Sequence, residues 1–158
     1  MRITENQKNS KDKQLYLERV NQFFNQVEDW LPQFKIIRTD INQDNTGVNK
    51  TPSLSIVKKD INDKEDNAVA DLFPEGNSVL MGEGIIKING PYGQESIIYM
   101  LKDGWIIQDR FGKERQMYQG IKCDGWYWLE SSYRNIVHLV DKAILMDLLK
   151  MVSLYDQA

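Results

Sequence analysis

The acidic side chain best placed for chemistry is Glu83, which lies between two glycines in an otherwise apolar stretch. Burial in such a strand-like run would raise the pKa of its carboxyl group toward the range of a general acid. The flanking glycines would also let another group approach closely. Glycosidase-like hydrolysis needs a second carboxylate, for which Asp109, Glu114 and Glu130 are candidates. The alternative is that Glu83 points to solvent, so it is a candidate buried acid and no residue is predicted to be catalytic.

Cysteine and histidine each occur once, as Cys123 and His138. This excludes zinc sites built from several Cys and His ligands within one chain. A nucleophilic Cys–His pair would have to consist of these two residues. A structural thiol and an ordinary histidine are the simpler interpretation, so we expect both to be catalytically idle. Walker, dinucleotide-binding and Gly-x-Ser-x-Gly motifs are absent, and neither a metal nor a cofactor is predicted.

Aromatic and basic side chains favour binding over catalysis. The sequence Asp-Gly-Trp occurs twice, and a further Trp lies two positions after the second occurrence, which predicts one shared sheet face. Partly buried Trp side chains dominate binding energy at many interfaces. A basic turn between the two Asp-Gly-Trp sequences is expected at the rim of this surface. The predicted recognition site therefore consists of Trp105, Trp126, Trp128, Arg110, Lys113 and Arg115.

Composition narrows the classes of function. The chain has 158 residues and a formal net charge of −3, which does not favour nucleic acid as a partner. Its first residues are polar and no apolar run reaches about eighteen residues, so we expect no membrane segment. The single cysteine agrees with a reducing compartment, and the cytoplasm is the expected location. We expect a disordered segment over 1–9 and a single domain over 10–158.

The scaffold is most readable between residues 78 and 130, where aromatic and β-branched runs alternate with turn signals. An Asp-Gly pair between 95–101 and 105–110 predicts that these two runs form a hairpin. In an earlier run, 79–89, Ile86 and Ile88 lie on the more apolar face, since side chains alternate along a strand. Together the runs predict an antiparallel meander.

An N-terminal helix is predicted over about 11–31. From Leu17 onward, apolar residues recur at alternating steps of three and four, which is typical of an amphipathic helix. Ser10 is expected to cap its start. Pro32 is expected to end it, because proline disfavours helical geometry in the residue before it.

A C-terminal helix is predicted over about 142–154, with Asp141 as its N-cap. Its residues are mostly apolar, so it is either sandwiched inside the domain or meets another subunit in a homo-oligomer. The fold class is α+β: an antiparallel sheet of about five to seven strands whose two faces are both covered, with the helices as the available cover. The predicted core contains Val20, Phe24, Val27, Leu31, Ile86, Ile97, Ile106, Leu145, Leu148 and Val152.

Three classes of function remain open. The leading prediction is a small soluble non-enzymatic module that binds another protein, as inhibitors, immunity proteins, adaptors and chaperones do. The alternatives are a small-molecule-binding domain with a pocket between sheet and helix, and an enzyme of unrecognised type using carboxylates such as Glu83. An exposed apolar patch, an enclosed pocket and converging titratable groups would favour these classes in that order.

Overall fold

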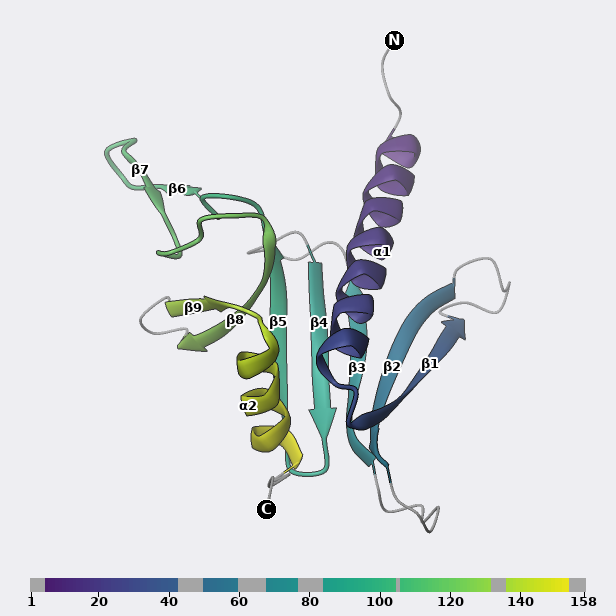
Figure 1. Cartoon of the computed structure of the whole chain (residues 1–158). Coiled ribbons are helices and arrows are strands. Elements are labelled where there is room, and N and C mark those ends of the chain that lie inside the picture. The colour runs from purple at the N-terminus through teal and green to yellow at the C-terminus, as the bar shows by residue number, and fades with distance from the viewer. Residues whose placement is uncertain are drawn as a thin grey trace.

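The computed structural model of the chain describes residues 5–42, 50–59, 68–76, 84–104, 106–131 and 136–153. The elements in chain order are α1 (Glu5–Trp30), β1 (Phe34–Asn42), β2 (Lys50–Lys58), β3 (Ala68–Gly76), β4 (Gly84–Gly90), β5 (Gly93–Met100), β6 (Ile106–Gln108), β7 (Glu114–Gln116), β8 (Gly125–Ser131), β9 (Ile136–Leu139) and α2 (Lys142–Ser153). Within the described residues, a seven-stranded antiparallel sheet has the order β1-β2-β3-β4-β5-β8-β9, and β6 pairs with β7 separately (Figure 1). The chain is therefore an α+β protein built on an antiparallel meander.

Helix α1 begins at Glu5 instead of after Ser10, so the predicted cap lies inside the helix. Residues 5–9, predicted to be disordered, belong to this helix, and Glu, Gln and Lys are good helix formers. The helix ends at Trp30, before Pro32, as predicted. Within the described segments, no helix combines the length and apolar character needed to cross a membrane.

Both helices pack on one face of the sheet. Ile86 of β4 lies opposite Ile97 of β5, so their side chains share a face. Phe24 of α1 and Leu148 of α2 belong to the same buried cluster as these two residues. Burying one such side chain stabilises a fold by about 1.5–3 kcal/mol. The predicted core residues found in this cluster are Val20, Phe24, Val27, Leu31, Ile86, Ile97, Leu145, Leu148 and Val152.

The expectation that the helices cover both faces is wrong. On the opposite face, Ile98 of β5 and Tyr127 of β8 are buried under the segment between β7 and β8, which contributes Tyr118 and Ile121. An irregular segment, and not a helix, thus covers this face, because apolar side chains can bury a sheet surface without regular secondary structure. Ile106, predicted in the core, is 49% exposed because β6 leaves the sheet.

The predicted hairpin between 95–101 and 105–110 does not form. Strand β5 pairs with β4 and β8, whereas β6 pairs with β7. The Asp-Gly turn itself exists, with φ values of 72° at Asp103 and 68° at Gly104 and a closing hydrogen bond of 2.8 Å from the Gly104 amide. The amide of Asp103 donates to the carbonyl of Ile121 at 3.3 Å, so the segment that follows β7 returns to lie beside this turn.

A competing strand explains the missing hairpin. Strand β8 places Trp128 opposite Ile97 and Tyr127 opposite Ile98, so it fills both faces of the sheet beside β5 with aromatic side chains. Strand β6 has only 3 residues. Because hydrophobic stabilisation scales with the apolar area removed from water, the larger aromatic strand outweighs the local turn signal.

Gly84 admits a helix side chain close to the sheet. A Cβ atom at Gly84 would lie 2.6 Å from the ring of Tyr16 in α1, so any larger residue would displace that ring. The Tyr16 hydroxyl donates to the carbonyl of Ile85 at 3.0 Å and accepts from the amide of Gly76 at 3.2 Å. Burial raises the pKa of Tyr16, so its phenol remains a neutral donor. The close approach predicted for a glycine next to Glu83 is thus made by Tyr16.

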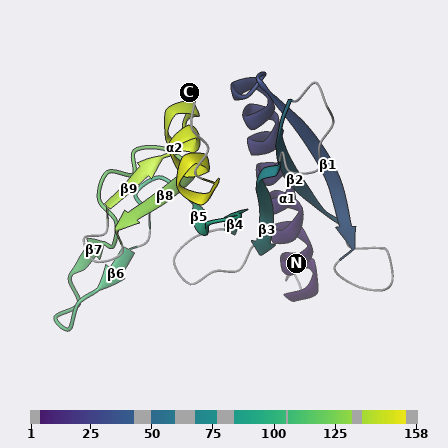
Figure 2. The same cartoon turned by 90° about the horizontal axis from the view of Figure 1, so that it is seen from below.

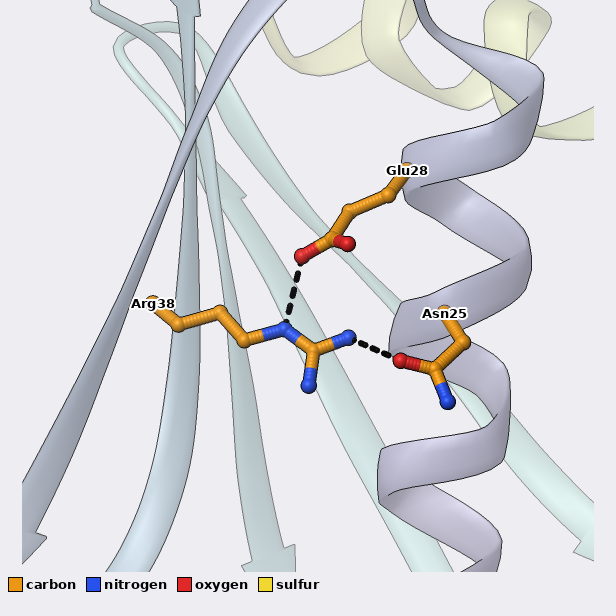
Figure 3. Close-up of polar contacts among 3 residues, drawn as sticks. All are labelled: Asn25, Glu28 and Arg38. Carbon is orange, nitrogen blue, oxygen red and sulfur yellow. Dashed lines mark hydrogen bonds and ion pairs between the residues drawn. The ribbon is translucent and has the colours of Figure 1, made fainter.

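Strand β1, at the edge of the sheet, is joined to α1 through Arg38. Its Nε donates to Oε1 of Glu28 at 2.7 Å, and its Nη2 donates to Oδ1 of Asn25 at 2.6 Å (Figure 3). The guanidinium carbon lies 5.9 Å from the centroid of the Phe24 ring. Arg38 therefore uses its charge and two of its N–H groups in contacts within the chain, at an exposed position.

The apolar side of α2 packs on the sheet. Its last turn docks on the turn between β4 and β5, where the amide of Tyr92 donates to the carbonyl of Val152 at 2.8 Å. Met151 remains exposed, and a homo-oligomer through this helix stays a prediction. The buried residues of α2 are Leu145, Met146, Leu148, Leu149 and Val152.

Asp141 caps α2, as predicted: its Oδ1 accepts a hydrogen bond from the amide of Ile144 at 2.8 Å. We expect Asp141→Ala to lower the free energy of unfolding by about 1 kcal/mol, because an amide at the helix start loses its acceptor. Asp141→Asn keeps an acceptor and should lower it much less. Urea unfolding followed by circular dichroism measures both variants, and equal losses would contradict the capping role.

Candidate functional site

The predicted site residues on β8 lie on the face that the helices cover. Trp126 is opposite Tyr99 and Trp128 is opposite Ile97, so the two indoles share a face, as predicted. Trp126 is 6% exposed and belongs to the main core cluster. Trp128 is half-buried against that cluster. Trp105 lies outside the described residues.

Trp128 has partners on both neighbouring strands. Its Nε1 donates to Oε2 of Glu95 on β5 at 3.1 Å. Its ring stacks on His138 of β9, with centroids 5.9 Å apart and an interplanar angle of 27°. The imidazole of His138 also bonds the carboxylate of Glu130. Trp128 therefore joins three strands at this end of the sheet.

The basic residues Arg110, Lys113 and Arg115 are exposed on the β6–β7 hairpin, here called the arm (residues 106–116). Phe111 lies in the turn of the arm and is 86% exposed. Oδ1 of Asp109 accepts hydrogen bonds from the amides of Phe111 and Lys113, at 2.8 and 2.9 Å. One carboxylate thus holds the turn that presents Phe111.

The arm and the β8 tryptophans lie on different sides of the sheet. The segment after β7 packs through Tyr118 and Ile121 on the face that carries Tyr127. Trp126 points to the opposite face, since neighbouring residues of a strand alternate. Figure 2 shows the arm extending on the side of the sheet away from α2. The predicted site residues therefore form two groups, and the basic turn does not border the tryptophan surface.

A cleft of about 380 Å³ lies between α1 and the start of β8. Helix α1 lines it with one stripe of side chains at steps of three and four, which includes Arg19, Phe23, Gln26 and Trp30. The other side consists of Tyr99, Cys123, Asp124, Gly125, Trp126, Leu139, Val140 and Asp141. A cleft between sheet and helix is the feature expected of a ligand-binding domain.

Aromatic rings form the apolar part of this cleft. The Trp126 ring lies 5.7 Å from that of Phe23 and 5.3 Å from that of Tyr99, and Phe23 also contacts Trp30 at 6.1 Å. Nε1 of Trp126 donates to the carbonyl of Arg19 at 3.4 Å. The guanidinium carbon of Arg19 lies 4.3 Å from the centroid of the Tyr99 ring. A cation and four aromatic rings therefore meet at one surface cleft.

Cys123 and His138 have different partners. The exposed thiol of Cys123 lies 3.7 Å from the hydroxyl of Tyr127, which donates to the carbonyl of Cys123 at 2.8 Å. Burial raises the pKa of Tyr127, so its phenol stays protonated at neutral pH. His138 bonds Glu130 instead. The thiol and the imidazole do not form a hydrogen-bonded pair, and their catalytic idleness stays a prediction.

The candidate carboxylates have separate surroundings. Glu83 lies outside the described residues. Asp109 organises the turn of the arm, Glu114 is exposed on β7, and Glu130 contacts His138. Across the described parts of the chain, no group of three or more His, Cys, Asp or Glu side chains is arranged to hold a metal ion.

Two candidate sites thus emerge, the arm with Phe111 in its turn and the cleft with Trp126 in its wall. The basic residues of the arm could be predicted from the sequence, but the exposure of Phe111 could not. A pocket between sheet and helix was one of the alternatives that the sequence offered, but the residues of this cleft were not predicted; the available signal was the spacing of Arg19, Phe23 and Trp30 along the helix. The chain matches no protein-family model, and comparisons with curated proteins and with solved structures found no significant match.

Proposed function

We propose that this protein is a small non-enzymatic module that binds another protein through the arm. One observation carries the proposal: Phe111 is 86% exposed in a turn that extends from the sheet. Aromatic residues dominate the binding energy of protein interfaces when a partner buries them. Transferring one Phe side chain from water into a pocket stabilises a complex by about 1.5–3 kcal/mol.

The turn of the arm is ordered before any partner binds. Asp109 accepts amide hydrogen bonds from Phe111 and Lys113 through its side chain, and its own amide donates to the carbonyl of Lys113 at 3.0 Å. Gly112 adopts the positive φ of 77° that the turn requires. Because the backbone around Phe111 is already fixed, binding loses less conformational entropy.

The charge of the arm indicates the chemistry of the partner. Arg110, Lys113 and Arg115 lie on the arm with Phe111, together with the two carboxylates of Asp109 and Glu114, so three positive charges less two negative charges leave the arm at +1. The whole chain carries a net charge of −3, so this positive region is local. Such a region orients a partner of opposite charge. The proposed partner is a protein with an apolar pocket bordered by acidic side chains, as a target of an inhibitor, immunity protein, adaptor or chaperone would offer.

The proposed location is the cytoplasm. Cys123 is an exposed free thiol. Exposed thiols persist in reducing compartments, whereas oxidising compartments convert them.

The test compares proteins captured from the cell of origin by immobilised wild-type protein, Phe111→Ala and Tyr92→Ala. Tyr92 is a matched control because it is 69% exposed on a turn elsewhere in the sheet. We expect a partner that Tyr92→Ala retains and that Phe111→Ala loses, with a fall in affinity of about 30-fold. Circular dichroism should show that both variants fold as the wild type does, because neither side chain is buried.

Two outcomes would contradict the proposal. One is a partner that Phe111→Ala retains at wild-type affinity. The other is binding of wild-type protein, but not Phe111→Ala, to vesicles of anionic phospholipid, since an exposed Phe among cations is also a membrane-surface signal. In that case the arm would be a lipid-binding element and not a protein-binding one.

A further inference from the structure

Arg19 and Arg38 both stack on an aromatic ring, but their N–H donors meet different surroundings. Arg38 is paired with Glu28 and Asn25 (Figure 3). Arg19 stacks over Tyr99, at 4.3 Å, and its guanidinium has no ion-pair or hydrogen-bond partner among the residues that the structure describes. A stacked guanidinium keeps its planar fork of donors along its edges, where a planar anion can accept two of them.

The cleft provides an apolar surface beside this free cation. Arg19 lines it together with Phe23, Trp30 and Trp126. Its volume of about 380 Å³ falls within the range of about 300–1,000 Å³ that small-molecule sites occupy. That space holds on the order of a dozen water molecules, which limits the ligand to a small one. Phe23 and Trp126 are only 2% and 6% exposed, so the half-buried Trp30 offers the more accessible ring, which favours an aromatic ligand in edge or offset contact.

Asp124 and Asp141 limit the charge of the ligand. Both line the cleft, and each already accepts a backbone hydrogen bond, from the amides of Lys102 at 2.7 Å and Ile144 at 2.8 Å. The two carboxylates repel any anion, and they repel a dianion twice as strongly as a monoanion, so the smallest negative charge, placed against Arg19 on the α1 side of the cleft, is favoured. The ligand is therefore expected to carry a single negative charge.

We propose that the cleft binds a small aromatic monocarboxylate. Its carboxylate accepts paired hydrogen bonds from Arg19, and its ring packs against Trp30, beside Trp126. This site is separate from the arm, so the proposal of a ligand here is independent of the proposed protein-binding function. A free acid and the C-terminal Phe of a peptide offer the same chemistry.

The test titrates the full chain with 3-phenylpropionate and with the uncharged 3-phenylpropionamide. Indole N–H signals in nuclear magnetic resonance spectra report binding, and the signal of Trp126 is identified by its loss in Trp126→Phe. We expect the acid to shift that signal and to bind at least about tenfold more tightly than the amide. Arg19→Gln should weaken the acid by a similar factor, whereas Arg38→Gln, a matched loss of charge outside the cleft, should leave its affinity unchanged.

Equal affinity for acid and amide would overturn the proposal, as would no shift with either at millimolar concentration or wild-type affinity in Arg19→Gln. Should Arg19→Gln not fold, Gln26→Trp keeps the cation, fills the cleft and is expected to abolish binding. The tripeptide Gly-Gly-Phe, with a free or an amidated C-terminus, identifies the source of the carboxylate. Tighter binding of the free tripeptide than of 3-phenylpropionate indicates a peptide terminus, and weaker binding indicates a free acid.

Discussion

Replacing Gly90 with Ala is expected to lower the free energy of unfolding by about 3 kcal/mol or more. A Cβ atom at this position would lie 2.3 Å from the carbonyl oxygen of Val152 and 2.7 Å from its carbonyl carbon. These are backbone atoms of the last turn of α2, and they cannot rotate away as the end of a side chain can. The same carbonyl accepts the hydrogen bond from Tyr92, so moving the helix would break that contact too.

Gly93 provides the matched control for Gly90. A Cβ atom there would have its nearest neighbours at 3.9 Å, in Met151, and 4.0 Å, in Val152, which is ordinary van der Waals contact. Gly93→Ala should therefore change stability little, or raise it by up to about 1 kcal/mol by restricting the unfolded chain. Urea unfolding of both variants measures the difference. Equal midpoints would mean that α2 does not approach the sheet at Gly90 as closely as the structure has it.

Features set by local patterns could be predicted from the sequence. The alternation that places Ile86 and Ile88 on one face, the capping of α2 by Asp141 and the end of α1 before Pro32 depend on neighbours within a few residues. The start of α1 could not be placed in the same way. Several residues before Ser10 have a high helix propensity, so the helix can extend past a residue that could cap it. A serine at position 10 therefore did not fix the start of the helix.

Pairings between distant segments could not be predicted with the same certainty. Two runs in the chain open with Asp-Gly-Trp, and local turn chemistry predicted that the nearer one pairs with β5. In the structure, β5 pairs with the run that contains Trp126, because the aromatic side chains of that run fill both faces of the sheet. Apolar residues on both faces of the strands likewise showed that both faces of the sheet must be covered. They did not show that Tyr118 and Ile121 would cover one of these faces.

The candidate sites also depend on contacts between distant segments, which the sequence does not show. The sequence places Phe23 in an amphipathic helix and Phe111 in a turn, but it does not show whether another segment covers that turn, because exposure depends on which segments meet in the fold. The cleft joins α1 to the starts of β8 and α2, and β8 begins 95 residues after the end of α1 (125 − 30). Only the helical spacing of its α1 side chains was visible in advance.

Trp126→Ala is expected to lower the free energy of unfolding by about 3–5 kcal/mol, the range for deleting a large aromatic side chain from a core. Trp126 is 6% exposed and contacts both Phe23 and Tyr99, so its loss leaves a cavity between α1 and the sheet. The carbonyl of Arg19 would also lose its indole donor. Trp126→Phe fills part of the space and should recover part of the loss.

Phe111→Ala is the matched aromatic control for this prediction, because Phe111 is 86% exposed and its removal should leave stability within about 0.5 kcal/mol of the wild type. Thermal and urea unfolding of Trp126→Ala and Phe111→Ala separate the two roles that sequence alone could not assign. A Trp126→Ala variant as stable as Phe111→Ala would place the indole at the surface, and the proposed carboxylate cleft would then lack its rigid aromatic wall. If only Trp126→Ala lowers the free energy of unfolding strongly, Trp126 is part of both the cleft wall and the core. The packing that stabilises the fold then also fixes the shape of the cleft.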